Sequence, residues 1–295
     1  MNSIKDFIRN NPVLTYFIIT FTISWGGTIL VMSGSGGIPT TKEQFDMQLP
    51  IAILLMLVGP SAAGLLLTGI VYGRADFRDL LSRLLKWRVS LRWYAIALLT
   101  APIVLMATLL ALSLTSPVYL PGIFTMNDKV GRLISGMMAG LAVGFFEELG
   151  WTGFAVPRLR LRYSILTTGL IVGVLWGAWH IMGQVIMASG TYSGALPLQV
   201  FLIANTISLL IGQLPAFRIL MVWVYDRTGS LLVAMLMHVT YTAATMIFAP
   251  LAIPGVPLFI YGWVSAAVMW VIAIAVAMAN RRHLLRQTLL PRQVA

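Results

Sequence analysis

The chain has 295 residues, of which 59% are hydrophobic and only 10% are charged, and its mean hydropathy is +0.89. A soluble domain carries about 25% charged residues, so this composition excludes an ordinary soluble protein and indicates an integral membrane protein. The net charge of +11 does not indicate a nucleic-acid partner, because the basic residues lie in short segments between apolar stretches. The absence of cysteine excludes disulfides and thiolate metal sites.

Eight stretches of the sequence reach the length of about 20 mostly apolar residues that a transmembrane helix needs. They predict helices over residues 13–33, 49–72, 93–115, 133–156, 164–187, 198–225, 230–250 and 257–279. The period-two alternation of membrane β-strands is absent. We therefore expect an all-α, polytopic transmembrane helix bundle of about eight spans, which forms a single integral-membrane domain over residues 1–295.

Basic residues are concentrated in one set of alternating loops and tails. This set contains Lys5, Arg9, Arg74, Arg78, Arg83, Lys86, Arg88, Arg92, Arg158, Arg160, Arg162, Arg227, Arg281, Arg282, Arg286 and Arg292. The opposite set contains Lys42, Lys129 and Arg132. Because cytoplasmic loops carry an excess of Lys and Arg, this bias predicts that both termini are cytoplasmic. The expected location is the cell (inner or plasma) membrane, with the lipid bilayer as a partner.

The connector between the second and third spans, residues 74–92, is basic and amphipathic. Its apolar residues recur at helical spacing: Phe77, Leu80, Leu81, Leu84, Leu85 and Trp87. This pattern predicts a helix that lies on the membrane surface. Further along, the sixth span contains Gln213, Leu214 and Pro215. We expect an interruption there, because proline removes a backbone donor and kinks or breaks a helix.

Glu147 and Glu148 are adjacent carboxylates inside the fourth predicted span. A charged side chain near the bilayer centre costs at least about 2.5–3.5 kcal/mol on insertion scales, so an acidic residue there is a functional candidate. Successive helical residues point about 100° apart, so the two side chains cannot face the same spot, although both can line one polar cavity. Thr152 follows Glu148 by four residues, within hydrogen-bonding reach on the same face.

Two histidines lie in later spans. His180, in the fifth, follows Trp176 by four residues, and His238, in the seventh, precedes Thr242 by four. A carboxylate in apolar surroundings suits a general base, and a nearby histidine can share the proton of an attacking water and pass it to a leaving amine. A second histidine with a hydroxyl beside it can donate to the oxyanion. The set therefore supports hydrolysis of a peptide bond.

A catalytic metal is the competing interpretation of the same residues. His180, His238 and Glu148 would form a two-histidine, one-carboxylate zinc set. The H-E-x-x-H motif of many zinc proteases is absent. The favoured interpretation assigns no metal and requires no cofactor, and zinc is the alternative.

Three segments resemble the motifs of one family. Residues 145–153 (FFEELGWTG) resemble E-E-x-x-x-R, residues 175–180 (LWGAWH) resemble an aromatic residue followed four positions later by His, and residues 238–242 (HVTYT) resemble H-x-x-x-N. Motifs in this order, on three predicted spans, are similar to those of the CAAX protease and bacteriocin-processing family (CPBP, or Abi). The family-like core covers residues of about 130–250.

The resemblance implies an intramembrane endopeptidase, a hydrolase that cleaves a peptide or a membrane-anchored protein. Carried over by position, it implies that Glu147 activates the attacking water and that His180 assists. Glu148 would be the supporting carboxylate, and His238 with Thr242 would lie on the oxyanion side. The family has been labelled a metalloprotease group, and a metal-free glutamate mechanism is the other description of it.

Two residues depart from these motifs. Thr152 stands where the first motif has Arg, and Thr242 stands where the third has Asn. An arginine would give Glu148 a fixed cation and a fork of donors, which threonine lacks. The nearest arginines along the chain, Arg158 and Arg160, look like loop residues.

The departure at position 152 keeps two further functions open. One is peptide binding by a catalytically silent family member, as in bacteriocin immunity, in which the peptidase activity is reduced or absent. The other is a proton-coupled transporter in which the carboxylates and histidines form a relay.

Overall fold

The computed structural model describes residues 2–33, 42–191, 194–250, 255–281 and 285. Arg282, Arg286 and Arg292, which contribute to the predicted orientation, lie outside these ranges. The described residues form no strands, and their α-helices are α1 (Asn2–Asn10), α2 (Pro12–Phe21), α3 (Gly27–Met32), α4 (Lys42–Leu67), α5 (Arg74–Leu84), α6 (Leu91–Ser113), α7 (Gly122–Thr125), α8 (Lys129–Gly150), α9 (Val156–Arg160), α10 (Ile165–Thr191), α11 (Leu198–Ile211), α12 (Gln213–Thr228), α13 (Leu231–Phe248) and α14 (Val256–Ala279). The remaining turns are π-helical at η1 (Thr22–Gly26), η2 (Thr68–Tyr72) and η4 (Trp151–Ala155), and 3₁₀-helical at η3 (Pro117–Tyr119).

Within the described ranges, eight helical segments are long and apolar enough to cross a membrane. They are Pro12–Met32, Glu43–Tyr72, Leu91–Ser113, Lys129–Arg160, Ile165–Ala188, Leu198–Thr228, Leu231–Phe248 and Val256–Ala279. The prediction of an all-α, multi-pass bundle is confirmed, and each predicted span falls on one of these segments. The three π-helical turns each lie within one of these spans, and the helix continues into each of them without a break.

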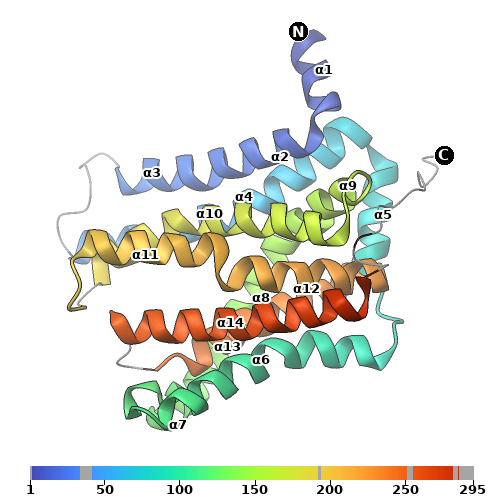
Figure 1. Ribbon diagram of the computed structural model, residues 1–295. Coiled ribbons are helices and arrows are strands. Elements are labelled where there is room, and N and C mark those ends of the chain that lie inside the picture. The colour runs from blue at the N-terminus through green and yellow to red at the C-terminus, as the bar shows by residue number, and fades with distance from the viewer. Residues whose placement is uncertain (1, 34–41, 192–193, 251–254, 282–284, 286–295) are drawn as a thin grey trace.

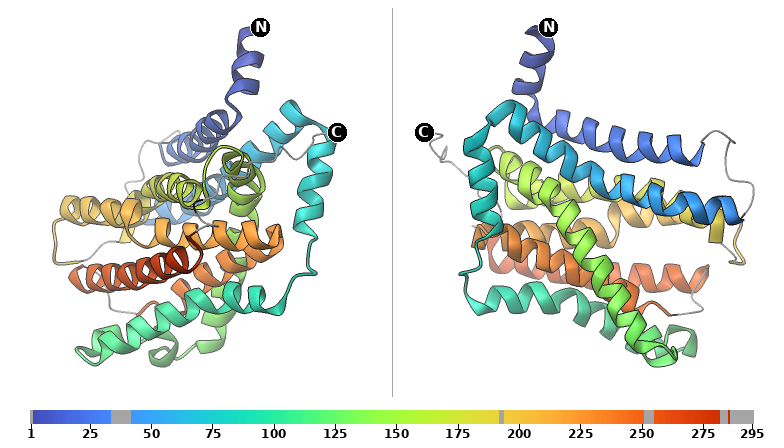
Figure 2. Two further views of the ribbon diagram at one scale, coloured as in Figure 1. Left: turned by 45° about the vertical axis from the view of Figure 1, so that its right-hand side comes forward. Right: turned by 180° about the vertical axis from the view of Figure 1, so that it is seen from behind.

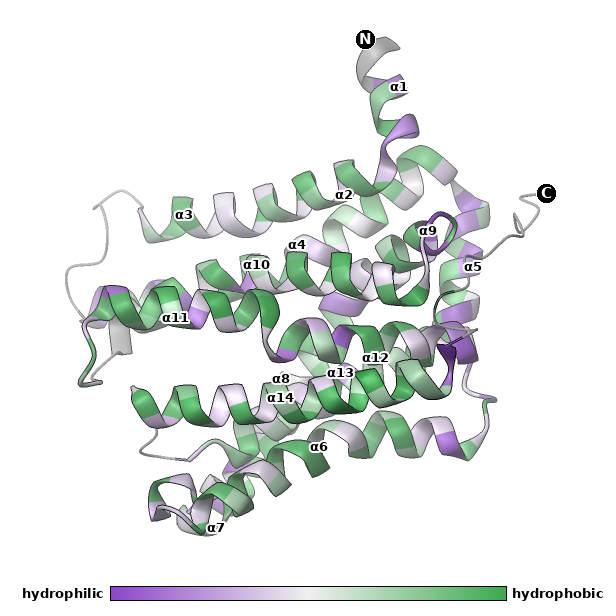
Figure 3. Cartoon of the chain, in the orientation of Figure 1, coloured by the Kyte–Doolittle hydropathy of each residue, from purple (hydrophilic) through white to green (hydrophobic). Residues whose placement is uncertain are grey.

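The spans run side by side as one bundle, and α8 crosses the others obliquely (Figures 1 and 2). The start of α2 and the end of α14 lie at the same end, where α5 runs across the bundle (Figure 1). Hydrophilic residues gather at that end on α5 and α9, whereas the spans are mostly hydrophobic along their length (Figure 3). This end of the bundle carries the loops that are rich in Lys and Arg. Its assignment to the cytoplasm stays a prediction.

A stripe of glycines on α8 lets α13 approach very closely. Gly136, Gly140 and Gly144 recur every four residues, so they share one face of the helix. A Cβ added at Gly140 would lie 2.5 Å from the backbone oxygen of Val239 on α13. Small residues allow membrane helices to pack backbone against backbone in this way. Glu148, one turn beyond Gly144, consequently faces α13.

The sixth span is interrupted where the sequence predicts it. α11 ends at Ile211 and α12 begins at Gln213, with Gly212 between them. Pro215 falls in the first turn of α12, where backbone N–H groups have no helical partner and a missing one is tolerated. A Cβ added at Gly173 of α10 would lie 2.6 Å from the Cα of Pro215, so α12 packs closely against α10.

The amphipathic connector is shorter than predicted, because the helix ends at Leu84 and not near residue 92. Two side-chain hydrogen bonds, one of them long-range, explain the end of the helix. Ser230 donates to the backbone oxygen of Lys86 at 2.6 Å, and Tyr94 donates to that of Trp87 at 2.6 Å. These carbonyls are thus satisfied outside a helix. The buried face of α5 packs Leu80 against Leu149, Leu231 and Met235.

Candidate active site

The two carboxylates of α8 are both buried, and they have different partners. Glu147 is 2% exposed and Glu148 is fully buried. Oε2 of Glu147 accepts the indole N–H of Trp151 at 3.1 Å and that of Trp176, on α10, at 2.7 Å. The two glutamates are therefore held by different sets of residues, as their angular separation on the helix requires.

Glu148 is bonded to three helical elements. Nη1 of Arg218, on α12, donates to Oε1 at 2.8 Å and to Oε2 at 2.9 Å. Nδ1 of His238, on α13, lies 2.8 Å from Oε1, and the hydroxyl of Thr152, in η4, donates to Oε2. A buried carboxylate is stable only when it is paired and hydrogen-bonded, and these contacts meet that condition.

Arg218 is the site residue that sequence reasoning did not identify. Its side chain is fully buried, and its guanidinium carbon lies 4.2 Å from the centroid of the Trp176 ring, in cation–π geometry. The signal was present in the sequence, because Arg218 is a charged residue inside an apolar span, like the two glutamates. The cation that Thr152 does not provide to Glu148 comes from Arg218 on α12.

The two arginines nearest to Thr152 in sequence have other acidic partners. Arg158 forms an ion pair with Asp76 of α5, and Arg160 forms one with Asp226 of α12 at 2.8 Å. α5 and α9 lie at the basic end of the bundle (Figure 1), and the two ion pairs connect α9 to α5 and to α12. They tie the end of the fourth span to its neighbours.

Both histidines pack against the indole of Trp176. The ring centroids lie 5.3 Å apart for His180 and 5.0 Å apart for His238, each in edge-to-face geometry. Nδ1 of His180 lies 2.8 Å from the backbone oxygen of Trp176. A carbonyl oxygen can only accept, so Nδ1 carries the proton, and in the neutral ring Nε2 is free to take one. His180 is thus oriented as a proton acceptor.

A cavity of about 590 Å³ lies next to these residues. Glu147, His180, His238, Trp176 and Thr242 line it. Glu148, Thr152 and Arg218 are not among its lining residues. The four predicted catalytic residues therefore form two layers, in which Glu147 and the histidines face the cavity and Glu148 supports His238 from behind.

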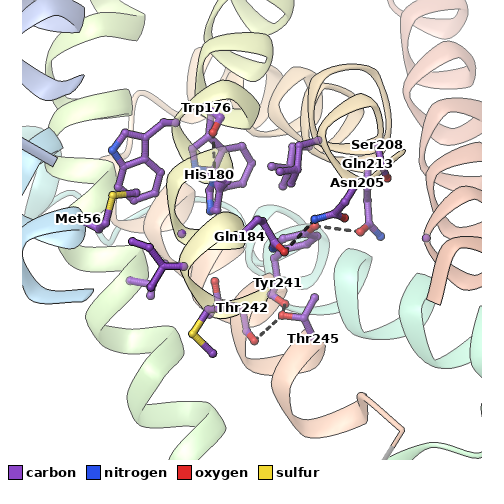
Figure 4. A pocket seen from close by; sticks show the side chains of 18 of the residues that line it. Met56, Trp176, His180, Gln184, Asn205, Ser208, Gln213, Tyr241, Thr242 and Thr245 are labelled. Carbon is purple, nitrogen blue, oxygen red and sulfur yellow. Dashed lines mark hydrogen bonds between the residues drawn. The ribbon is translucent and has the colours of Figure 1, made fainter. Parts of the chain in front are cut away.

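The rest of the cavity wall is mostly apolar, with a few paired polar side chains (Figure 4). Asn205 donates to Oε1 of Gln184 at 2.8 Å, and Tyr241 donates to Oε1 of Gln213 at 2.9 Å. Nε2 of Gln213 is buried and has no partner in the described part of the chain. Such a wall suits a largely apolar ligand that presents a small number of neutral hydrogen-bonding groups.

The residues do not fit the zinc set that the sequence left as an alternative. Across the described ranges, no group of three or more His, Cys, Asp or Glu residues is arranged to hold a metal. Both oxygens of Glu148 are engaged by the cation of Arg218, which would oppose a second cation at the same carboxylate. His180 and His238 line the cavity, whereas Glu148 contacts Nδ1 of His238 and does not line it.

Comparison with known proteins identifies the part of the chain that carries this site. Residues 129–244 match a family model described as Type II CAAX prenyl endopeptidase Rce1-like. The chain is 25% identical over 181 residues to CAAX prenyl protease 2 of Methanococcus maripaludis. That similarity covers 58% of this chain and 62% of the relative, so the chain spans less than two thirds of the relative's length. The matched region contains Glu147, His180, Arg218 and His238.

Proposed function

This chain belongs to the CAAX protease and bacteriocin-processing (CPBP) family of multi-pass membrane proteins, and from that membership we propose that it is an intramembrane endopeptidase. Its reaction is the hydrolysis of a peptide bond in a peptide or a membrane-anchored protein. One observation carries the proposal: Glu147 and His180 line the same cavity, on different helices, with both side chains held in fixed orientations.

In the proposed reaction, Glu147 takes a proton from a water molecule in the cavity, and the water oxygen adds to the carbonyl carbon of the substrate. The indoles of Trp151 and Trp176 hold the Glu147 carboxylate in place. Proton transfer requires this, because the carboxylate oxygen and the water oxygen must lie about 2.6–3.2 Å apart. Glu147 passes this proton to Nε2 of His180, which delivers it to the nitrogen of the leaving amine as the C–N bond breaks.

His238 and Thr242 are the proposed hydrogen-bond donors to the substrate carbonyl oxygen, which becomes negatively charged during the reaction. Both residues line the cavity. Nδ1 of His238 contacts Glu148, so Nε2 is available for another partner. When both ring nitrogens carry a proton, Nε2 donates a hydrogen bond to the oxyanion. Glu148 therefore acts through His238, without contact with the substrate.

The substrate class to test first is a prenylated peptide. The matched family model and the relative are named as a prenyl endopeptidase and a prenyl protease. An apolar cavity wall supports this choice, because a lipid-modified peptide buries an apolar chain together with a few amide groups.

The test is cleavage of a quenched fluorescent peptide, with and without a prenyl group, by the purified protein in liposomes. Glu147→Gln keeps the size of the side chain and an acceptor for the indoles, yet it cannot act as the base. We expect its rate to fall by about 100- to 10,000-fold, the range for general-base catalysis. Glu147→Ala, Glu148→Ala and His180→Ala should also be slow, and equal cleavage by these variants and the wild type would refute the proposal.

The silent-member alternative was based on the threonine at position 152. Arg218 supplies Glu148 with the cation that this threonine lacks, so the departure from the motif no longer favours an inactive protein. A peptide-binding protein without activity would protect its host equally well after Glu147→Gln, and this result would separate the two functions.

A further inference from the structure

Two donors from different parts of the chain meet at one carboxylate oxygen. Thr152 reaches Oε2 of Glu148 from the same span, and Arg218 reaches it from α12. Thr152 is also the position at which an arginine would carry its guanidinium toward Glu148. Position 152 and position 218 therefore provide two routes by which a cation can reach the same group.

Arg218 is connected to both layers of the site. Its Nη1 holds Glu148, which in turn contacts Nδ1 of His238. Its guanidinium face lies on the ring of Trp176, whose indole N–H holds Glu147. A displacement of this single side chain would therefore disturb the general base and the oxyanion side together.

The surroundings of Arg218 leave it little freedom to move. The side chain is fully buried, and a Cβ added at Gly173 of α10 would lie 3.2 Å from the Cβ of Arg218. A buried cation in a fixed position is suited to orientation, since it pays no ordering cost when substrate binds.

We propose that Arg218 is a positioning residue of the active site, and that it performs from α12 the role that an arginine at position 152 would perform from the fourth span. The proposal rests on the peptidase function proposed above. Arg218 does not line the cavity, so it acts through Glu148 and Trp176 and not on the substrate. The reacting groups are aligned by a cation that belongs to a different helix from both glutamates.

The experiment uses three variants and the wild type. The variants are Arg218→Ala, Arg218→Lys and a double variant that combines Arg218→Ala and Thr152→Arg. Cleavage of the prenylated peptide is measured over a range of substrate concentrations, to separate kcat from KM. We expect kcat of Arg218→Ala to fall about 10- to 100-fold, as for supporting residues at other catalytic centres, with KM changed little. Arg218→Lys should lie between Arg218→Ala and the wild type, because lysine keeps the charge and loses the flat guanidinium that lies on the ring of Trp176.

The double variant is the decisive arm. An arginine introduced at position 152 should raise kcat about tenfold above that of Arg218→Ala, a change within the range for supporting residues. Arg132→Ala is the matched control, because Arg132 is a partly buried arginine at the far end of α8 that bonds the backbone oxygens of Ile247 and Ala249. We expect it to lower thermal stability without lowering kcat of the folded protein.

Each result bears on the proposal separately from the function. Wild-type kcat in folded Arg218→Ala, or a loss confined to KM, overturns the positioning role and leaves the peptidase function intact. A folded double variant no faster than Arg218→Ala overturns it as well. If Arg218→Ala does not fold, Arg218→Lys and the double variant decide by the same criteria. Absence of cleavage by the wild-type protein overturns both proposals.

Discussion

The indole nitrogen of Trp176 on α10 and Oε2 of Glu147 on α8 lie 2.7 Å apart. Trp151 donates to the same oxygen from the fourth span. If Glu147 is the general base, as proposed, its carboxylate is already fixed by two indoles and does not need to be reoriented when substrate arrives. The tryptophan of the second motif thus has a defined polar task in addition to its packing.

Trp176→Phe removes this donor and keeps an aromatic face for Arg218. We expect kcat to fall about tenfold, in the range for supporting residues, and the free energy of unfolding to fall by about 1.5–3 kcal/mol for a lost hydrogen bond to a charged group. Peptide cleavage and thermal unfolding measure the two effects. Trp179→Phe is the control, because its indole nitrogen has no partner in the described chain. Equal effects of the two substitutions on kcat would contradict this interpretation.

Gln213→Leu tests whether the cavity binds the peptide groups of the substrate. Its amide has one unpaired half, and a peptide group offers both a donor and an acceptor to satisfy it. We expect KM to rise about 2- to 10-fold, the value of one neutral hydrogen bond, with kcat little changed. Thr245→Val is the control, because its hydroxyl already donates to the backbone oxygens of Tyr241 and Thr242. An unchanged KM for Gln213→Leu would exclude this contact.

Gly140→Val should separate α8 from α13. Its Cβ would lie 2.5 Å from the backbone oxygen of Val239, which cannot move without displacing the helix. We expect a loss of at least about 1–3 kcal/mol in the free energy of unfolding, as for overpacked sites. Cleavage should also fall, since Glu148 and His238 lie across the same interface. Gly26→Ala, where a Cβ meets nothing within 4 Å, is the control for the loss of a glycine.

Removal of divalent metals should leave cleavage unchanged. The cation of Arg218 already occupies the carboxylate that a zinc set would need. The assay is cleavage after dialysis against a chelator, followed by addition of zinc. Activity that disappears on dialysis and returns with zinc would show that a metal is required and would contradict this prediction.

The spans were predictable because each is a long apolar run, and the bilayer demands that length. The pairing of Glu148 with Arg218 was not, because sequence does not specify how each helix is rotated about its axis. That rotation follows from contacts such as Gly140 against α13 and Gly173 against α12. The spacing alone indicated that the two glutamates face different spots and left open that both line one cavity, whereas only Glu147 lines it. The choice of Glu147 as the residue that activates water came from the family resemblance.

The end of α5 was missed for a related reason. The apolar spacing continues past Leu84, so the local pattern favours more helix. The contacts that end it come from Ser230 and Tyr94, and Ser230 is distant in sequence. A tertiary hydrogen bond of this kind leaves no trace in the periodicity of the segment.

The wide turn η4, directly after the two glutamates, has a consequence for chimeras and for deletions. A π-helical turn takes up one residue more than an α-helical turn within nearly the same rotation, so α9 leaves the span close to the direction that an uninterrupted α-helix would give it. Winding all five residues Trp151–Ala155 as α-helix would instead rotate α9 by about 100°, turning Arg158 away from Asp76 and Arg160 away from Asp226. Grafts between this protein and its relatives must therefore either keep the wide winding of this segment or remove one residue from it.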